Sequence, residues 1–479
     1  ANQMLDKSGF ISEGYDYANI WAQYEGSIQS LPYLEFENRP QSVQLELSES
    51  IIPIASLEDM IAINSTSSHV FAEGMAFELI TNGGLNNHYV VVNDIDLSTT
   101  SAFTSSLIEG VFSGIFDGNG YTISGLSIDA GVDNIGLFEQ VSGASIKNLT
   151  ISSSNITGNN NVGTLIGKLP NSSENNLLNI QVINSTVSGI DSVGGLIGES
   201  LAAPTIISTV SFSGEVNGSN FVGGIIGYNK SNLTMASVIN NGIVDGSDDY
   251  VGGMIGLHST GDINISGSSN FGDVFGSQLV GGIIGFVGSF SDVDIVNSLN
   301  TGKITGANYV GGLIGRQNDP VGIGSSYNTG TILATDSPSK KGAIIGDSND
   351  SLGLSVVYYL SENGLNAIGE GSVTTGTASA ISIAQMAALS TFEDAGWDIA
   401  RYPTASAVWS IQYDGQTTYP WLTEMGEPHA SQIIETIPVF TAQDFETMND
   451  NLFGNFELQN DIDFSSYTGL SQAFIQGRF

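Results

Sequence analysis

The sequence of 479 residues contains no cysteine. Disulfide bonds, thiolate zinc sites, iron–sulfur clusters and cysteine nucleophiles are therefore excluded. Basic residues are also scarce, because 11 lysine and arginine residues face 49 aspartate and glutamate residues, which gives a formal net charge of −38. This imbalance argues against binding to nucleic acid, whose phosphates are neutralised by lysine and arginine, and against binding to anionic membrane surfaces.

Long apolar runs are missing as well. No stretch of about 18 consecutive apolar residues occurs, so the sequence predicts no transmembrane helix and no insertion into a membrane. No segment in the middle of the chain has a 3.6-residue apolar period long enough for a helix. Glycine, in contrast, is abundant with 60 residues, which indicates many tight corners in an ordered chain.

An internal repeat fills the middle of the chain. The string Val-Gly-Gly-X-Ile-Gly, in which X is leucine, isoleucine or methionine, begins at Val193 and returns four times at spacings of 29 or 30 residues. A related string begins at Val162, 31 residues earlier. The repeat glycines that we expect at coil corners are Gly194, Gly198, Gly223, Gly227, Gly252, Gly256, Gly281, Gly285, Gly311 and Gly315.

Asparagine follows the same period in the later copies. An asparagine at one position of every coil would form a ladder, in which each side-chain amide bonds to the amides above and below it. The predicted ladder residues are Asn240, Asn270, Asn300 and Asn328.

Short aliphatic runs separated by glycine and asparagine at a fixed period predict an all-β fold. A single coil of this kind cannot bury its own apolar face, whereas stacked coils bury a continuous core. The sequence therefore predicts a β-solenoid, or parallel β-helix, of roughly eight coils of about 30 residues each, with flanking cap segments.

These strings resemble the GLUG-motif repeats, which are named for a Gly-Leu-hydrophobic-Gly core. Residues 195–198 and 312–315 match that core directly, and other copies carry isoleucine or methionine in place of leucine. The resemblance covers about residues 111–350 and implies a bacterial surface or adhesin-like protein. Some immunoglobulin A-cleaving metallopeptidases carry such repeats together with a zinc-binding HExxH motif. None of the four histidines of this chain lies in that motif, so the peptidase activity is not carried over.

Sequence elements near the two ends occur twice. The string Asn-Asp-Ile-Asp-Leu-Ser at residues 93–98 returns as Asn-Asp-Ile-Asp-Phe-Ser at residues 460–465. Similarly, Ile-Pro-Ile at residues 52–54 returns as Ile-Pro-Val at residues 437–439. These repetitions predict that a second module begins near residue 437.

The glycine and aromatic pattern of residues 385–422 is repeated, in turn, by residues 3–34. One complete module then lies between two partial ones. The predicted segments are the tail of a preceding module (1–34), a linker (35–50), an N-terminal cap that leads into the solenoid (51–110), the GLUG-type solenoid (111–350), a C-terminal cap (351–422), a second linker (423–436) and the head of a following module (437–479).

Two explanations for the partial modules stay open. In the first, the chain is a slice of a large surface adhesin that contains tandem modules. In the second, the chain is a whole subunit, and its partial modules complete each other between copies. Such a head-to-tail contact generates an open fibre. Both explanations predict end-to-end partners, either adjacent modules of the same chain or copies of the chain itself.

Carboxylates at alternate strand positions are the candidate metal ligands. Asp94 and Asp96, and their second copies Asp461 and Asp463, each flank one apolar residue and are expected to point to the same face. Oxygen ligands of this kind suit Ca²⁺. Solvated or turn-capping carboxylates are the alternative, and the sequence requires no other cofactor.

A polysaccharide-active β-helix enzyme is the catalytic alternative, because paired carboxylates can hydrolyse a glycosidic bond. Acidic residues are so abundant here that any one pair carries little information, and the basic residues that lyases use are scarce. The sequence therefore predicts no enzymatic activity. It predicts an extracellular, cell-surface structural or adhesive rod, whose candidate ligand is a glycan or another cell-surface molecule.

Overall fold

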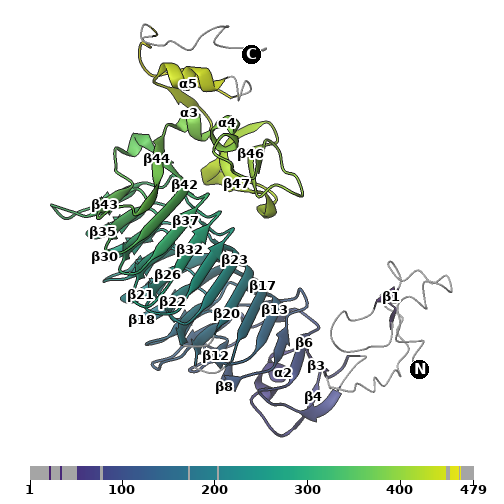
Figure 1. The fold of residues 1–479 in the computed structure, drawn as a ribbon. Helices are drawn as coiled ribbons and strands as arrows, with labels where there is room; N and C mark the ends of the chain where they lie inside the picture. The colour runs from purple at the N-terminus through teal and green to yellow at the C-terminus, as the bar shows by residue number, and fades with distance from the viewer. Residues whose placement is uncertain are drawn as a thin grey trace.

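The computed structural model describes residues 21–22, 33–34, 51–75, 79–170, 173–201, 204–448, 454–462 and 464. Between residues 51 and 381 the chain winds into an elongated stack of parallel strands (Figure 1). The predicted all-β solenoid is confirmed, with about nine turns in place of the roughly eight expected. Before it, β1 (Trp21–Ala22) pairs antiparallel with β2 (Tyr33–Leu34).

Each repeat coil passes through three parallel sheets in turn. The ten-stranded sheet consists of β8 (Ile108–Phe112), β12 (Phe138–Val141), β16 (Ile166–Leu169), β19 (Ile197–Leu201), β22 (Ile226–Lys230), β26 (Ile255–His258), β31 (Ile284–Val287), β36 (Ile314–Gln317), β41 (Ile345–Ser348) and β43 (Ile368–Glu370). The seven-stranded sheet consists of β15 (Val162–Gly163), β18 (Asp191–Gly194), β21 (Asn220–Gly223), β25 (Val251–Gly252), β30 (Gln278–Gly281), β35 (Asn308–Gly311) and β40 (Lys341–Gly342).

The third sheet has 23 strands, because it bends around two sides of the solenoid. Its strands are β3 (Ile51–Ile54), β6 (His88–Val91), β7 (Ile95–Asp96), β9 (Ile115–Asp117), β10 (Thr122–Ser124), β11 (Ser127–Asp129), β13 (Ser145–Ser152), β14 (Asn155–Thr157), β17 (Asn175–Ser188), β20 (Thr205–Gly218), β23 (Leu233–Asn240), β24 (Ile243–Gly246), β27 (Ile263–Ser266), β28 (Ser269–Asn270), β29 (Val274–Phe275), β32 (Val293–Val296), β33 (Leu299–Asn300), β34 (Ile304–Gly306), β37 (Val321–Gly324), β38 (Tyr327–Asn328), β39 (Ile332–Ala334), β42 (Leu352–Leu360) and β44 (Thr375–Ile381).

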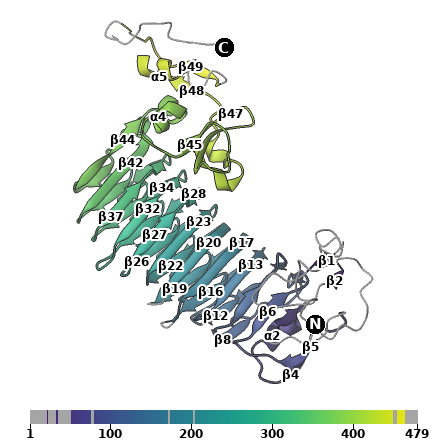
Figure 2. The same ribbon diagram turned by 45° about the vertical axis from the view of Figure 1, so that its right-hand side comes forward.

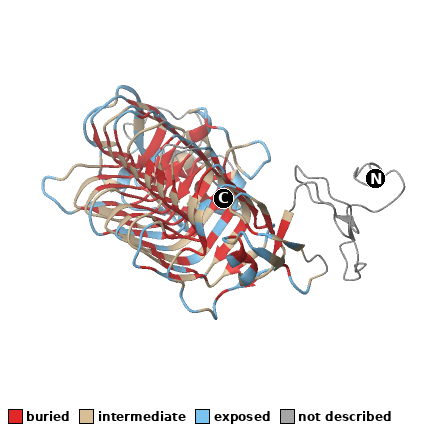
Figure 3. Ribbon diagram, turned by 90° about the horizontal axis from the view of Figure 1, so that it is seen from below, coloured by how far each residue is buried: buried red, intermediate tan, exposed pale blue. Residues whose placement is uncertain are grey.

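The repeat sequence sets the register of the stack. Val193 pairs with Val162 on one side and with Val222 on the other, and Ile197 pairs with Ile226. These aliphatic side chains point inward and are fully buried. Figure 3 shows this buried interior surrounded by exposed loops. Because full burial of one valine, leucine or isoleucine stabilises by roughly 1.5–3 kcal/mol, the stacked core is the main source of stability.

The N-terminal cap continues the stack with a helix and a hairpin. The helix α2 (Leu57–Ala62) begins after Ser56, whose hydroxyl accepts a hydrogen bond from the main-chain N–H of Asp59. The strands β4 (Ser68–Phe71) and β5 (Leu79–Asn82) pair antiparallel beside it.

The C-terminal cap is larger and less regular. Its elements are η1 (Ser361–Asn363), α3 (Ile383–Met386), α4 (Leu389–Glu393), β45 (Ile399–Ala400), β46 (Trp409–Tyr413), β47 (Gln416–Leu422), η2 (Thr423–Met425) and η3 (Ala430–Gln432). After them come β48 (Ile437–Val439), α5 (Ala442–Thr447) and β49 (Phe456–Leu458). In the described part of the chain, no helix is long and apolar enough to cross a membrane.

The three-stranded sheet β45–β47 lies against the side of the later coils, not only over the end of the stack (Figure 2). A second buried core joins the two parts. Trp397 and Trp409, with ring centroids 4.9 Å apart, pack there with Leu299, Tyr327 and Tyr358 of the solenoid. The cap therefore holds several coils together through this shared apolar core.

Candidate functional site

The repeat glycines lie at corners where a side chain would meet main-chain atoms of the same coil or of the preceding coil. A Cβ atom on Gly223 would lie 2.0 Å from the main-chain oxygen of Ile226, and one on Gly227 would lie 2.5 Å from main-chain atoms of Ser192 and Val193. These distances are too short for any side chain. A Cβ would meet a main-chain atom at 2.6 Å or less at every predicted corner: Gly194, Gly198, Gly223, Gly227, Gly252, Gly256, Gly281, Gly285, Gly311 and Gly315.

The four asparagines of the later coils form a buried ladder. The side-chain amide of Asn240 donates to Asn270 (2.8 Å), that of Asn270 donates to Asn300 (2.7 Å), and that of Asn300 donates to Asn328 (2.7 Å). Each amide also donates to the carbonyl of a glycine two residues later, as Asn240 does to Gly242 (3.0 Å). All four side chains are fully buried, so these bonds satisfy groups that water cannot reach.

His258 lies inside the stack as a neutral imidazole. Its Nδ1 accepts from the side-chain amide of Asn229 (3.0 Å), and its Nε2 donates to the main-chain oxygen of Gly261 (2.7 Å). Burial of the ring lowers the pKa of His258 to about 4. A buried, hydrogen-bonded and neutral histidine of this kind is a packing element of the core.

One column of residues has a left-handed backbone conformation that most of its side chains do not indicate. In six consecutive coils, the residue before the Val-Gly pair has a φ of 55–66°: Asn161, Ser192, Phe221, Tyr250, Leu279 and Tyr309. Bulky residues rarely adopt this left-handed conformation. The rings of Phe221 and Tyr250 pack against each other with centroids 5.1 Å apart. Their stacking between coils favours large side chains at these positions.

The predicted Ca²⁺ ligands of the first copy cap the backbone of neighbouring residues. Oδ1 of Asp94 accepts from the main-chain N–H of Thr122 (2.8 Å), and Oδ1 of Asp96 accepts from that of Ser98 (2.9 Å). Hydrogen bonds from Ser98 lower the pKa of Asp96. Asp461 is exposed, and Asp463 lies outside the described residues. Among the described residues, no group of three or more histidines or carboxylates is placed to hold a metal ion.

Polar contacts reinforce the packing of the C-terminal cap on the solenoid. The buried hydroxyl of Tyr327 donates to the main-chain oxygen of Pro420 (2.6 Å) and accepts from the amide of Gln432 (2.8 Å). The ring of Phe271 stacks on His429, with centroids 4.1 Å apart. Residues 423–436, which the sequence predicts to be a linker, thus include side chains that contact the coils.

A joint lies directly after the last strand of the solenoid. The chain leaves β44 through Ser382, which caps α3 by accepting from the main-chain N–H of Gln385 (3.1 Å). The hydroxyl of Ser382 also donates to Oδ1 of Asp444, at the start of α5. Ala384 and Ala387 form a small buried core with Ile437 of β48. These contacts fix β48 and α5 to the end of the solenoid.

The unit that docks at this joint has the same local structure as the start of the module. In both copies a strand leads to a hydroxyl cap and a short helix. The main-chain N–H of Asp59 donates to the hydroxyl of Ser56, and the carboxylate of Asp59 accepts from the N–H of Ala55 (2.8 Å). In the second copy, the N–H of Asp444 donates to the hydroxyl of Thr441, and its carboxylate accepts from the N–H of Phe440 (3.2 Å). Moreover, β3 pairs in parallel with β6, and β48 pairs in parallel with β49. We call this strand–cap–helix arrangement the opening unit.

Comparisons with known proteins show similarity to a sequence relative and to a solved structure. No model of a known protein family matches the chain. The chain is 33% identical over 141 residues to Halomucin from Haloquadratum walsbyi, and the match covers 27% of this chain and 1% of Halomucin. A crystal structure from Bacteroides ovatus, described as a candidate immunoglobulin A1 protease, has 15% sequence identity. The match covers 81% of this chain and 95% of that chain, with a TM-score of 0.34.

Proposed function

We propose that this protein is an extracellular structural and adhesive protein, a rod-like β-solenoid segment of a large surface adhesin of the GLUG-motif kind. The observation that carries the proposal is the second opening unit, β48 with α5, docked on α3 at the end of the solenoid. A module end that holds the opening unit of another module is an assembly joint. Repetition of this joint would place modules end to end.

The interior of the solenoid supports a mechanical role. Main-chain hydrogen bonds between coils run along the rod axis, and the asparagine ladder adds side-chain bonds in the same direction. Stretching the rod would require many of these bonds to break together. The likeness to Halomucin supports an extracellular location, since that name denotes a mucin, and the small share of Halomucin that is matched supports a very long polypeptide.

In this proposal the protein has no enzymatic activity. Its buried carboxylates are engaged in structural contacts: Asp347 lies 3.0 Å from Nε of Arg316 and 3.5 Å from Nζ of Lys340, and Asp117 lies 3.3 Å from Nζ of Lys147. The Arg316–Asp347 and Lys147–Asp117 pairs join residues of adjacent strands in the stack.

A fibre of separate subunits is the second candidate function, and the edge of β44 favours it. Within the described residues, β44 pairs only with β42, and most of its side chains are exposed. An unpaired strand edge can template the strand of another chain. Head-to-tail pairing through this edge would give an open fibre. Sedimentation of the purified chain distinguishes the two candidates, because only the fibre predicts polymers that grow with protein concentration.

The joint can be tested with two variants of the full chain. Ala384→Asp places a charge in the buried core of the joint, and Asp444→Asn removes the carboxylate that Ser382 contacts. Ser379→Asp is the matched control, because Ser379 is exposed on the nearby strand β44. We expect faster amide hydrogen exchange at residues 437–439 and 454–458 in both joint variants and no change in the control. Unchanged exchange in both joint variants would contradict the proposal.

A further inference from the structure

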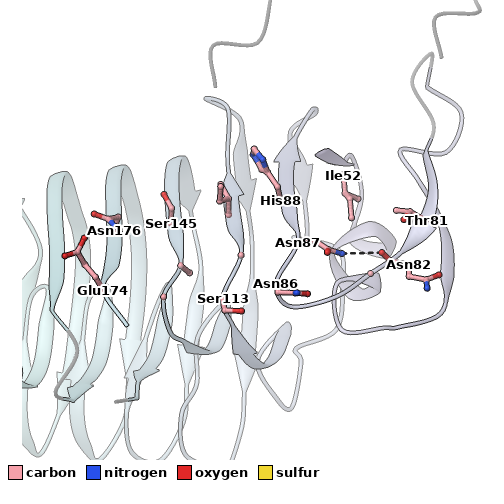
Figure 4. A pocket seen from close by; sticks show the side chains of 15 residues that line it. Ile52, Thr81, Asn82, Asn86, Asn87, His88, Ser113, Ser145, Glu174 and Asn176 are labelled. Carbon is pink, nitrogen blue, oxygen red and sulfur yellow. Dashed lines mark hydrogen bonds between the residues drawn. The ribbon is translucent and has the colours of Figure 1, made fainter. Parts of the chain in front are cut away.

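A polar groove of about 740 Å³ lies on the side of the first coils (Figure 4). Its floor is a row of outward-facing residues that are paired across adjacent strands: His88 on β6, Ile115 on β9, Ser145 on β13 and Asn176 on β17. Four strands spaced about 4.8 Å apart give the floor a length of about 14 Å. The groove therefore runs along the rod axis and suits an elongated ligand.

Amides and hydroxyls form most of the wall. Asn82 lines it from the end of β5, Asn86 and Asn87 line it from the loop before β6, and Glu174 lines it from the corner before β17. The side chains of Asn86, Glu174 and Asn176 make no hydrogen bond with another described residue and are accessible to solvent. These groups are available to a ligand without breaking a contact of the protein.

The wall loop is held in place by the first coils. The main-chain N–H of Ser113 donates to Leu85 (2.7 Å), and that of Ile115 donates to Asn87 (3.1 Å). The hydroxyl of Tyr89 donates to the main-chain oxygen of Gly84 (2.9 Å). A groove that is already ordered loses little conformational entropy when a ligand binds.

We propose that this groove binds a neutral oligosaccharide that lies along the rod. Side-chain amides offer donors and acceptors next to each other, and each sugar hydroxyl is both a donor and an acceptor. Ile115 adds an apolar surface to the floor. The lining contains no lysine or arginine, and the chain carries a net charge of −38, so an anionic ligand would be repelled.

The same lining argues against two other uses. An extended peptide would bind by adding a strand to a free sheet edge, whereas the floor strands are paired on both sides within the stack. Hydrolysis of a glycosidic bond requires two carboxylates, and Glu174 is the single carboxylate among the lining residues. The groove would therefore hold the sugar without cleaving it. This inference rests on the adhesive part of the proposed function.

The test uses the labelled full chain on a printed array of neutral oligosaccharides, followed by calorimetric titration with the strongest binder. Asn86→Ala and Asn176→Ala should each weaken binding by about tenfold. Asn264→Ala is the matched control, because Asn264 is an exposed asparagine in the same outward row, three coils further along and outside the groove. The Asn264→Ala variant should bind the oligosaccharide with the same affinity as the unmodified chain.

Four results would overturn the inference. They are the absence of binding to any neutral sugar on the array, unchanged affinity in both groove variants, an equal loss in the Asn264→Ala control, and preference for an extended peptide over every sugar. Thermal unfolding of each variant verifies that the surface change leaves the fold intact. Because the joint is tested separately by hydrogen exchange, a negative result here would leave the rod proposal standing.

Discussion

At the scale of single residues, the space left at each coil corner decides which glycines are replaceable. A Cβ on Gly223 would meet the main-chain oxygen of Ile226 at 2.0 Å, whereas the nearest atom to a Cβ on Gly324 is a methyl group of Val296 at 3.6 Å. We expect Gly223→Ala to lower the free energy of unfolding by at least about 2 kcal/mol and Gly324→Ala to change it by less than about 0.5 kcal/mol. Urea unfolding of the two variants checks this contrast. Equal stability of both would show that the corner at Gly223 is less closely packed.

The asparagine ladder is a second test at this scale. Asn270→Ala removes the acceptor of Asn240 and the donor to Asn300 in a fully buried site. Because unpaired buried polar groups are costly, we expect a loss of about 2–4 kcal/mol in unfolding free energy. The exposed Asn264→Ala serves as the control, with an expected change below about 0.5 kcal/mol. Similar losses in both variants would argue against the ladder.

His258 makes stability depend on pH. Its pKa in the folded chain is about 4 because the ring is buried, and the unfolded chain has the ordinary value of 6.5. The unfolded state therefore binds the proton first. The contribution of neutral His258 to the free energy of unfolding is complete above pH 6.5. It is lost as the pH falls toward about 4, and the total loss is about 3 kcal/mol. His258→Gln should lack this component, so its unfolding free energy should fall less between pH 7 and pH 4. Parallel pH profiles of unfolding free energy for the unmodified chain and His258→Gln would contradict this role of His258.

At the scale of elements, the coils were predictable and the position of the cap was not. The Val-Gly-Gly period fixes the stack because each coil repeats the same corner and the same buried aliphatic positions. The cap, in contrast, packs on outward-facing Leu299 and Tyr327, whose direction follows from strand register and not from composition. Apolar residues on the outer face of a strand do not indicate by themselves which segment will cover them.

Two further features were missed for similar physical reasons. In the left-handed column that includes Phe221 and Tyr250, only the first member, Asn161, is of a residue type that usually indicates this conformation, and the bulky later members give no such signal. The groove was missed because its asparagines, such as Asn86 and Asn176, are common residues in this chain. Only the fold brings a loop and four strands together around them. The predicted calcium ligands remain a prediction, and the first pair caps the backbone.

The attachment of the cap can be tested by removing one hydroxyl. Tyr327→Phe deletes the donor to Pro420 and the acceptor for Gln432 in a buried contact. We expect residues 416–432 to exchange amide hydrogens faster, with a local loss of about 1–2 kcal/mol, while the coils keep their protection. Tyr309→Phe is a suitable control, because the hydroxyl of Tyr309 makes no hydrogen bond with the described residues. Unchanged exchange at residues 416–432 would show that apolar packing alone holds the cap.

At the scale of the whole molecule, stacking makes a rod because each coil buries its apolar face only against its neighbours. The ten-stranded sheet gives one module a length of about 45 Å, since adjacent strands lie about 4.8 Å apart. The opening unit at the far end is held by the Ser382–Asp444 contact and by Ile437. In the proposed assembly, these contacts would give consecutive modules a fixed orientation.

Electron microscopy of the protein isolated from its source tests this central claim most directly. If opening units dock on module ends, the images should contain straight rods much longer than one module, with a regular repeat along the axis. This result is expected whether the modules belong to one chain or to successive subunits. Isolated particles about 45 Å long that stay separate at every concentration, or modules joined at random angles, would contradict the account.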